Sequence, residues 1–179
     1  MEFDSDTFRR VMGHFATGVS VVTTLEPTAA GERPVGITVN ALSSVSLDPP
    51  LVMVALDRRR RITPVIRAAG RYAVNILGES QQWLSDCFAG APVVPDREAF
   101  CGAAWRPGET GLPILDGVIA SLECTIVGVH PVGDHDLFIG RVVALANEEV
   151  HPMPLLYYRR RYLRIERATT VELEGRPEE

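Results

Sequence analysis

The chain has 179 residues, enough for one domain with a buried core, and its 46% apolar and 23% charged residues are ordinary for a soluble globular protein. A net charge of −5 argues against a nucleic-acid-binding face, which needs a surplus of basic residues. The polar start of the chain and the lack of an apolar run of about 18 residues argue against a signal peptide and a membrane span.

The first third of the chain predicts one helix followed by strands. An apolar stripe at the spacing of one helical face predicts the helix, and its members are Phe8, Val11, Met12 and Phe15. Apolar or alternating runs predict strands over residues 19–24, 35–41 and 51–56. Pro49 and Pro50 have no N–H to give to a ladder, so residues 42–50 are predicted to end pairing and turn the chain.

The rest of the chain predicts two short helices among more strands. One helix opens with Thr63 as cap and Pro64 and ends at Gly70, and the other covers residues 80–88. Further strands are predicted over residues 71–77, 118–130, 137–147 and 155–165. Residues 89–113 read as a long surface loop, and loops of that length often cover a ligand.

Strands therefore outnumber helices and are separated by turn signals rather than by regular helical crossovers. This pattern favours a closed antiparallel barrel with helices at its edge over a doubly wound parallel sheet. Neither an internal repeat nor a linker divides the chain. We expect one domain over residues 1–167 and a disordered polar tail over residues 168–179.

Several kinds of site are disfavoured by what the sequence lacks. Cys87, Cys101 and Cys124 are odd in number and widely spaced, so we expect buried, reduced thiols rather than disulfides or structural zinc. The four histidines are dispersed, and no metal site is expected. There is no G-x-G-x-x-G, Walker, G-x-S-x-G or H-E-x-x-H motif.

Three polar segments are candidate ligand sites, each with a plainer explanation. Residues 36–46 end a strand in short hydroxyl and amide side chains, which suit a flavin or a phosphate, but Asx and Ser turns explain them equally. Asp57 precedes the four arginines at 58–61, which suit a phosphate, although at least two match a solvated loop tip. Asp134 can hold one ring nitrogen of His135 and leave the other for a ligand, but a hairpin histidine is often simply exposed.

Seven short pieces occur in one order along the chain. They are FATGVSVVTT from Phe15, GITVNALSSVSLDPPLV from Gly36, RYAVNIL from Arg71, FAG from Phe88, LDG from Leu115, LEC from Leu122 and GDHDLFIGRV from Gly133. In this combination the chain, over about residues 7–165, resembles the flavin reductase family of two-component flavin monooxygenases.

The resemblance implies a mainly β fold, a split β-barrel of Greek-key type with a few flanking α-helices, in a homodimer with flavin in a groove near the subunit interface. Contacts with the flavin ring are implied for Thr38, Val39, Asn40 and Ala41. Contacts with its ribityl and phosphate groups are implied for Ser43, Ser44 and the segment from Asp57. The resemblance also places Phe88 near the cofactor and His135 at the nicotinamide. Family members often carry Ser or Thr after this Asp, where the chain has Arg60 and Ile62, so Arg60 or Arg61 is a candidate substitute.

The activity implied is reduction of FMN or FAD by NADH or NADPH in the cytoplasm, with reduced flavin passed to a transient partner, a flavin-dependent monooxygenase. Cofactors carry this chemistry and the protein supplies positioning, so His135, the one expected catalytic residue, would orient the nicotinamide rather than transfer a proton. Without a dinucleotide fingerprint, NADH would bind folded or loosely across the barrel. Residues 36–46 contain few large side chains that could hold a flavin in place, so reduced flavin would diffuse away.

Three alternatives stay open on the same barrel. They are a non-catalytic or electron-carrier FMN-binding protein, an oxidase of the pyridoxamine-phosphate type that keeps its flavin, and a ligand-free dimeric scaffold. The choice between FMN and FAD, and between NADH and NADPH, also stays open.

Overall fold

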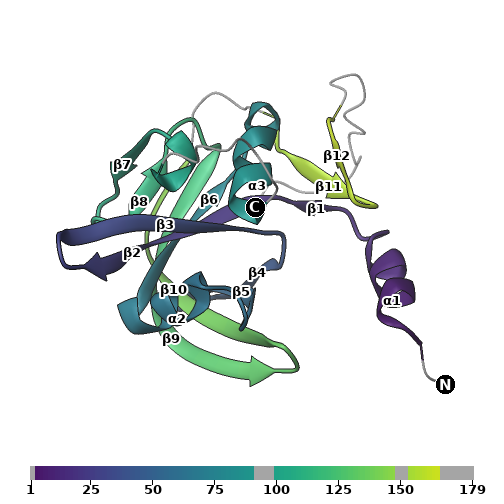
Figure 1. Cartoon of the computed structure of the whole chain (residues 1–179), viewed down its shortest axis with the longest axis horizontal. Coiled ribbons are helices and arrows are strands. Elements are labelled where there is room, and N and C mark those ends of the chain that lie inside the picture. The colour runs from purple at the N-terminus through teal and green to yellow at the C-terminus, as the bar shows by residue number, and fades with distance from the viewer. Residues whose placement is uncertain (1–2, 91–98, 148–152, 166–179) are drawn as a thin grey trace.

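The computed structural model describes residues 3–90, 99–147 and 153–165. Its centre is a seven-stranded antiparallel sheet in the order β3-β2-β6-β9-β10-β5-β4, shown in Figure 1. The strands are β2 (Ser20–Thr28), β3 (Gly31–Val39), β4 (Leu42–Leu47), β5 (Pro50–Asp57), β6 (Arg71–Ile76), β9 (Ala120–Val132) and β10 (His135–Asn147).

The two edge strands of this sheet, β3 and β4, follow each other in the chain and are joined through Asn40 and Ala41. The sheet curves back on itself, as Figure 1 shows, yet within the described ranges no hydrogen-bonded ladder joins β3 to β4. The predicted mainly β, antiparallel architecture is confirmed. Closure of the sheet by pairing of its two edges, which the strand pattern favoured, is not seen in the described residues, where the chain itself connects β3 to β4.

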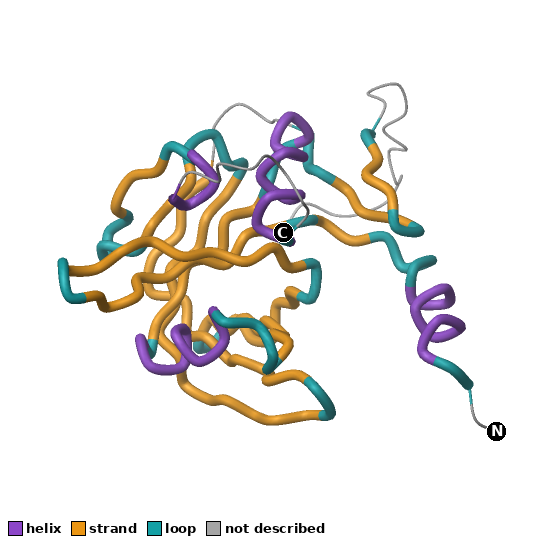
Figure 2. Tube along the Cα trace, in the orientation of Figure 1, coloured by secondary structure: helices purple, strands orange, loops and turns teal. Residues whose placement is uncertain are grey.

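Smaller elements surround the sheet, and Figure 2 shows the helices on the outside of the strands. The helices are α1 (Ser5–Met12), α2 (Ile62–Ala69) and α3 (Gln82–Ala89), with short 3-10 segments at Glu79–Gln81 and Ala99–Gly102. β1 (Thr17–Gly18), β11 (Leu156–Tyr158) and β12 (Arg161–Leu163) form a second sheet, and β7 (Trp105–Pro107) pairs with β8 (Pro113–Leu115). Each helix in the described ranges is too short or too polar to span a bilayer.

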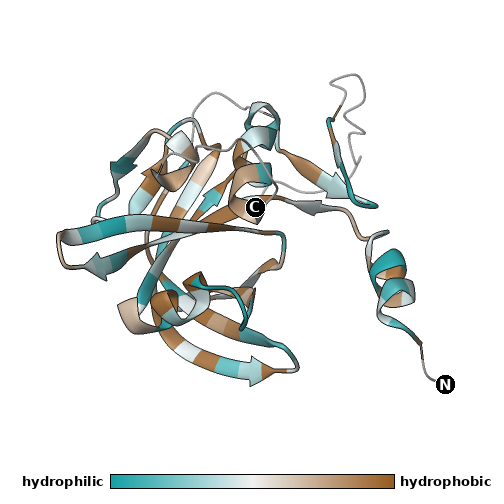
Figure 3. Cartoon of the chain, viewed as in Figure 1, coloured by the Kyte–Doolittle hydropathy of each residue, from teal (hydrophilic) through white to brown (hydrophobic). Residues whose placement is uncertain are grey.

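Two hydrophobic cores lie on opposite faces of β2 and β6. Val22 and Val74 point into one core, with side chains from β5 and α2. Val21 and Ala73 point into the other, with side chains from α3 and β8. Because successive side chains of a strand face opposite ways, burial of both faces explains why apolar residues follow one another in these strands, as Val21 and Val22 do, instead of alternating with exposed polar ones. Bands of contrasting hydropathy along β9 and β10 are visible in Figure 3.

A buried amide links the sheet to the second core. Asn75 is fully buried, and its Nδ2 donates to the carbonyl of Val21 at 3.1 Å and to the hydroxyl of Thr23 at 3.0 Å. Its Oδ1 accepts from the main-chain N–H of Leu115 in β8 at 2.8 Å. Since all these polar groups are paired, Asn75 holds β8 on the sheet without the cost of an unsatisfied buried group.

The predicted helices form with two differences. The apolar stripe of α1 is present, but no residue of this helix is buried, and Figure 1 shows it projecting away from the sheet. α2 ends at Gly70 in the left-handed conformation as predicted (φ 67°). It begins at Ile62 rather than at a Thr63 cap, because the Thr63 hydroxyl donates to the carbonyl of Asp57 instead.

Three strand boundaries differ from the predictions. Residues 42–47 form β4 and pair with β5, because the prolines fall in the turn and at the first strand position, where no ladder N–H is needed. The connection between β9 and β10 shrinks to Gly133 and Asp134, so His135 begins a strand. The last predicted strand is a hairpin, β11 and β12, that turns at Arg159 and Arg160.

The expectation of three reduced cysteines is wrong for two of them. Cys87 at the end of α3 and Cys101 form a disulfide, with their Cα atoms 6.2 Å apart. The fold brings together two residues separated by 14 positions, which spacing alone does not reveal. Cys124 is buried and free as expected. The predicted 89–113 loop contains the Ala99–Gly102 segment and β7 and runs into β8, whereas residues 91–98 and the predicted tail lie outside the described residues.

Candidate functional site

The predicted site residues meet where β3 passes into β4, at the end of β5 and the start of β10. Pairing of β5 with β10 sets Asp57 directly opposite His135. The main-chain N–H of Ala55 in β5 donates to the carbonyl of Ala41 at 3.1 Å. Segments that lie far apart in the sequence are therefore fixed side by side through the main chain.

These segments enclose a cleft of about 240 Å³, here the first cleft. Its lining includes seven of the predicted residues, namely Thr38, Val39, Asn40, Ala41, Asp57, Arg60 and His135. Its other lining residues are aliphatic, namely Ile37, Ala55, Leu56 and Ala89. Sequence analysis missed these four, although Ala55 and Leu56 end a predicted strand beside Asp57.

A second cleft of about 390 Å³ adjoins the first and shares Ile37, Arg60 and Ala89 with it. Phe88 and Arg61, both predicted site residues, line this second cleft. The remaining lining residues are Arg33, Pro34, Val35, Gly36, Ile62, Cys87, Gly90, Phe100 and Cys101. The shared residues make the two clefts one continuous feature, with Arg60 at the junction.

Ser43 and Ser44 are not brought to this feature. Both lie further along β4 and are exposed, and neither lines either cleft. The hydroxyl of Ser43 donates to the neighbouring carbonyl of Ser44 at 3.1 Å.

The four consecutive arginines separate into different roles. Arg59 is held by Asp57, whose carboxylate accepts from the Arg59 main-chain N–H at 2.9 Å and from its guanidinium at 2.8 Å. These hydrogen bonds hold the pKa of Asp57 well below its ordinary value. Arg58 donates to the carbonyl of Gly133, and Arg61 pairs with Glu26 at 3.2 Å.

Arg60 differs from its neighbours. Its side chain has no carboxylate partner among the residues that the structure describes, and it lines both clefts. A guanidinium that the described residues leave unpaired at the junction of two clefts is well placed to receive an anionic ligand group. The hypothesis that at least two arginines serve the turn rather than a ligand agrees with the contacts of Arg58 and Arg59.

His135 is held as the sequence predicts. Its Nδ1 lies 2.7 Å from the carboxylate of Asp134, and this hydrogen bond lowers the pKa of the Asp134 carboxyl. The imidazole is 40% exposed at the edge of the first cleft. With one ring nitrogen engaged by Asp134, Nε2 is the nitrogen available to a ligand.

Thr38 is tied to the helix that carries Phe88. Its hydroxyl donates to the carbonyl of Ser85 in α3 at 2.7 Å, which joins β3 to α3 across the cleft wall. The hydroxyl proton of Thr38 is therefore engaged within the protein. The contribution of Thr38 to a ligand is left to its main chain and its hydroxyl lone pairs.

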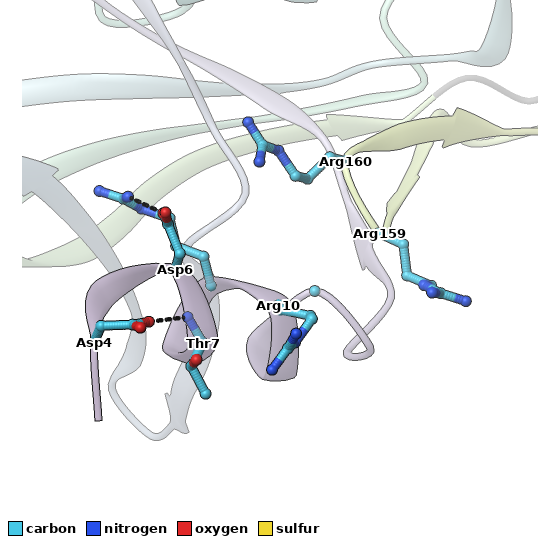
Figure 4. A pocket seen from close by; sticks show the side chains of 8 residues that line it. Asp4, Asp6, Thr7, Arg10, Arg159 and Arg160 are labelled. Atoms are coloured by element: carbon cyan, nitrogen blue, oxygen red, sulfur yellow. Dashed lines mark hydrogen bonds and ion pairs between the residues drawn. The ribbon is translucent and has the colours of Figure 1, made fainter. Parts of the chain in front are cut away.

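A further cleft, of about 520 Å³, lies elsewhere, between α1 and the turn joining β11 to β12. Figure 4 shows the side chains of Arg10, Arg159 and Arg160 pointing in different directions rather than toward one point. Arg9 is paired with Asp6 at 3.1 Å, and Asp4 caps the helix through the N–H of Thr7. This cleft is therefore not built around a single anion. Nor do three or more His, Cys, Asp or Glu side chains gather into a metal site in the described residues.

Comparisons with known proteins agree on one family. Residues 12–166 match the family model described as "Flavin reductase like domain". The chain is 39% identical to the flavin-dependent monooxygenase, reductase subunit HsaB, of Mycobacterium tuberculosis over 176 residues, which is 98% of this chain and 90% of that protein. It is 44% identical to an NADH-dependent flavin reductase of Rhodococcus sp over 146 residues, 81% of this chain and 78% of that protein.

A solved structure shows the same fold. The crystal structure of a nitrilotriacetate monooxygenase component B homologue from Mycobacterium thermoresistibile superposes with a TM-score of 0.86. The two chains are 40% identical, and the match covers 97% of this chain and 93% of the other.

Proposed function

We propose that this chain, which belongs to the flavin reductase like family, uses a reduced nicotinamide nucleotide to reduce FMN or FAD and supplies reduced flavin to a flavin-dependent monooxygenase. The observation that carries the proposal is the continuous pair of clefts built from residues 38–41, Arg60 and His135. We also propose that the reaction takes place in the cytoplasm, where reduced nicotinamide nucleotides are regenerated.

The residues of the two clefts suit a flavin. A flavin combines a flat, largely apolar ring with a hydrogen-bonding edge and a phosphate. The first cleft offers small or aliphatic walls at Ala41, Ala55 and Leu56, beside the turn of main chain at Asn40. Arg60 offers a cation that has no ion pair within the described part of the chain, and Arg33 and Arg61 line the second cleft beyond it. We assign the ring to the first cleft and the phosphate-bearing end to the side of Arg60.

The protein's part in the reaction is positioning. Bound flavin supplies the hydride-accepting chemistry, and no acid–base dyad is needed for that step. His135, oriented by Asp134, holds the nicotinamide at the mouth of the first cleft. The aliphatic walls keep water from the reacting faces.

The proposal predicts NADH oxidation that depends on added flavin. Purified protein should oxidise NADH with FMN or FAD and only slowly with neither, measured at the nicotinamide absorbance. Rapid mixing with NADH should bleach the oxidised flavin band within the turnover time. Slow bleaching would favour an electron carrier, and turnover of a phosphorylated amine with retained flavin would favour an oxidase. Absence of any flavin affinity would favour the third alternative, a ligand-free dimeric scaffold.

Arg60→Ala is expected to weaken FMN binding about ten-fold, the effect of losing one hydrogen bond to a charged group. Quenching of flavin fluorescence measures the dissociation constant. Arg60→Lys should retain much of the affinity because it keeps the charge. Arg141→Ala is the control, since Arg141 is exposed on β10 and lines neither cleft. Equal FMN affinities for Arg60→Ala and Arg141→Ala would show that Arg60 does not contact the flavin.

His135→Ala is expected to raise the Michaelis constant for NADH about five-fold, the scale of one lost hydrogen bond, with a much smaller change in flavin affinity. Steady-state kinetics at saturating FMN measure it. The matched control is His130→Ala, an exposed histidine on β9 outside both clefts. NADH kinetics that match the wild type would show that His135 does not touch the nicotinamide.

We further propose that the chain is a homodimer. Phe8, Val11, Met12 and Phe15 are each at least half exposed on and after α1, a contiguous apolar stripe of the kind that a protein interface covers. Asn40 lines both the first cleft and another cleft, of about 300 Å³, beside α1, so the stripe borders the site. Sedimentation equilibrium should give twice the chain mass, and Met12→Glu should shift the mass toward the monomer. A wild-type monomer at micromolar concentration would refute the dimer.

A further inference from the structure

The Cys87–Cys101 disulfide belongs to the wall of the second cleft. Both cysteines line that cleft, together with Phe88, Phe100 and Arg60. Cys87 is buried in α3, and Cys101 is partly exposed in the Ala99–Gly102 segment. The covalent bond therefore joins a helix to a segment that has little secondary structure of its own.

The helix side of this bond is firmly held. Asp86 accepts from the hydroxyl of Tyr162 at 2.9 Å, and Ser85 hydrogen-bonds the same hydroxyl at 2.8 Å. The Phe88 ring packs so closely on β3 that a Cβ at Gly36 would lie 2.8 Å from it. These contacts do not depend on Cys101.

The other side of the bond is strained. Phe100, Cys101 and Gly102 are three consecutive residues in the left-handed region, with φ of 59°, 61° and 63°. Non-glycine residues adopt this region at a cost and keep it only where other contacts enforce it. The contacts are the disulfide, a hydrogen bond from the N–H of Ala103 to the Phe100 carbonyl, and the Phe100 ring between Phe88 and Trp105 at centroid distances of 5.1 and 6.2 Å.

We propose that Cys87 and Cys101 form a redox switch of the second cleft, in which the disulfide holds Phe100 against Phe88 in the flavin-binding shape and reduction to two thiols releases it. The proposal rests on the proposed function. Without the bond, the strained backbone at Phe100 relaxes and the aromatic wall loses its fixed shape. Flavin binding then carries the added cost of ordering that wall, so affinity falls.

Hydrogen peroxide is the oxidant that this chemistry itself supplies, because reduced flavin that escapes reacts with oxygen to give it. Two thiols and one peroxide molecule yield the disulfide and two water molecules. The reverse step takes two electrons and two protons from a dithiol, which becomes a disulfide in turn. Peroxide would thus drive the chain to the state that holds flavin more tightly and lets less of it escape.

The test compares FMN affinity in the two redox states of the wild-type protein. Treatment with a phosphine reductant should raise the dissociation constant at least about five-fold, and subsequent peroxide should restore it. Cys87→Ser and Cys101→Ser should bind FMN like the reduced protein in either condition. Cys124→Ala should respond like the wild type, because Cys124 lies in the hydrophobic core beneath α2, where burial raises the pKa of its thiol to about 12.

Thiol counting makes the result decisive. Denatured without reductant, the oxidised chain should take up one alkyl group by mass spectrometry, and after reduction three. Three alkyl groups after peroxide treatment, or equal FMN affinities in two states with different thiol counts, would overturn the switch while leaving flavin reduction intact. Absence of flavin-dependent NADH oxidation in both states would overturn the proposed function and the switch with it.

Discussion

The pairing of β10 with β5 is the contact on which the candidate site depends. It places His135 opposite Asp57, and a hydrogen bond from the N–H of Arg58 to the carbonyl of Asp134 joins the turns beyond them. Because side chains alternate along a strand, a slip of one residue would exchange His135 for its neighbour Asp136. Asp136 instead lies buried on the opposite face, paired with Arg67 of α2 at 2.7 Å. The buried carboxylate of Asp136 and the exposed imidazole of His135 thus depend on the same register.

Charge in this region is mostly used to hold the protein together. Glu26 of β2 pairs with Arg33 at 2.6 Å and with Arg61 at 3.2 Å, and Asp57 engages Arg59. Exposed pairs of this kind contribute little stability individually, but they fix where the guanidinium groups lie. The arginine-rich turn is therefore largely occupied with its own scaffold. The cationic character left for a ligand is concentrated at Arg60, where the two clefts join.

The sequence predicted features that depend on local chemistry. The apolar runs gave the strands, Gly70 ended α2, and the adjacent Asp134 and His135 form the expected hydrogen bond. Features that depend on distant contacts were missed. Residues 42–47 read as a turn because their strand character comes from pairing with β5.

The roles of the side chains in the site also depend on distant contacts that the sequence does not reveal. The four arginines look alike in sequence, and only the positions of Glu26, Asp57 and Gly133 separate them. Cys87 and Cys101 meet beside the contact between Phe88 and Phe100, a tertiary arrangement that no spacing rule contains. Ser43 and Ser44 were selected by resemblance, and their distance from the clefts follows from the direction in which β4 leaves Ala41.

Burial of β2 and β6 on both faces has a consequence for how the molecule fluctuates. Their amides are shielded by two cores and by Asn75, so their hydrogens should exchange with solvent only through global unfolding. The walls of the clefts include β3, an edge strand of the sheet, and residues 40–41, which lead to the other edge strand, and opening costs far less at such edges. The main-chain amides of the central strands therefore exchange slowly. The edge strands can open locally, which lets a bulky nucleotide bind and leave while the fold stays intact.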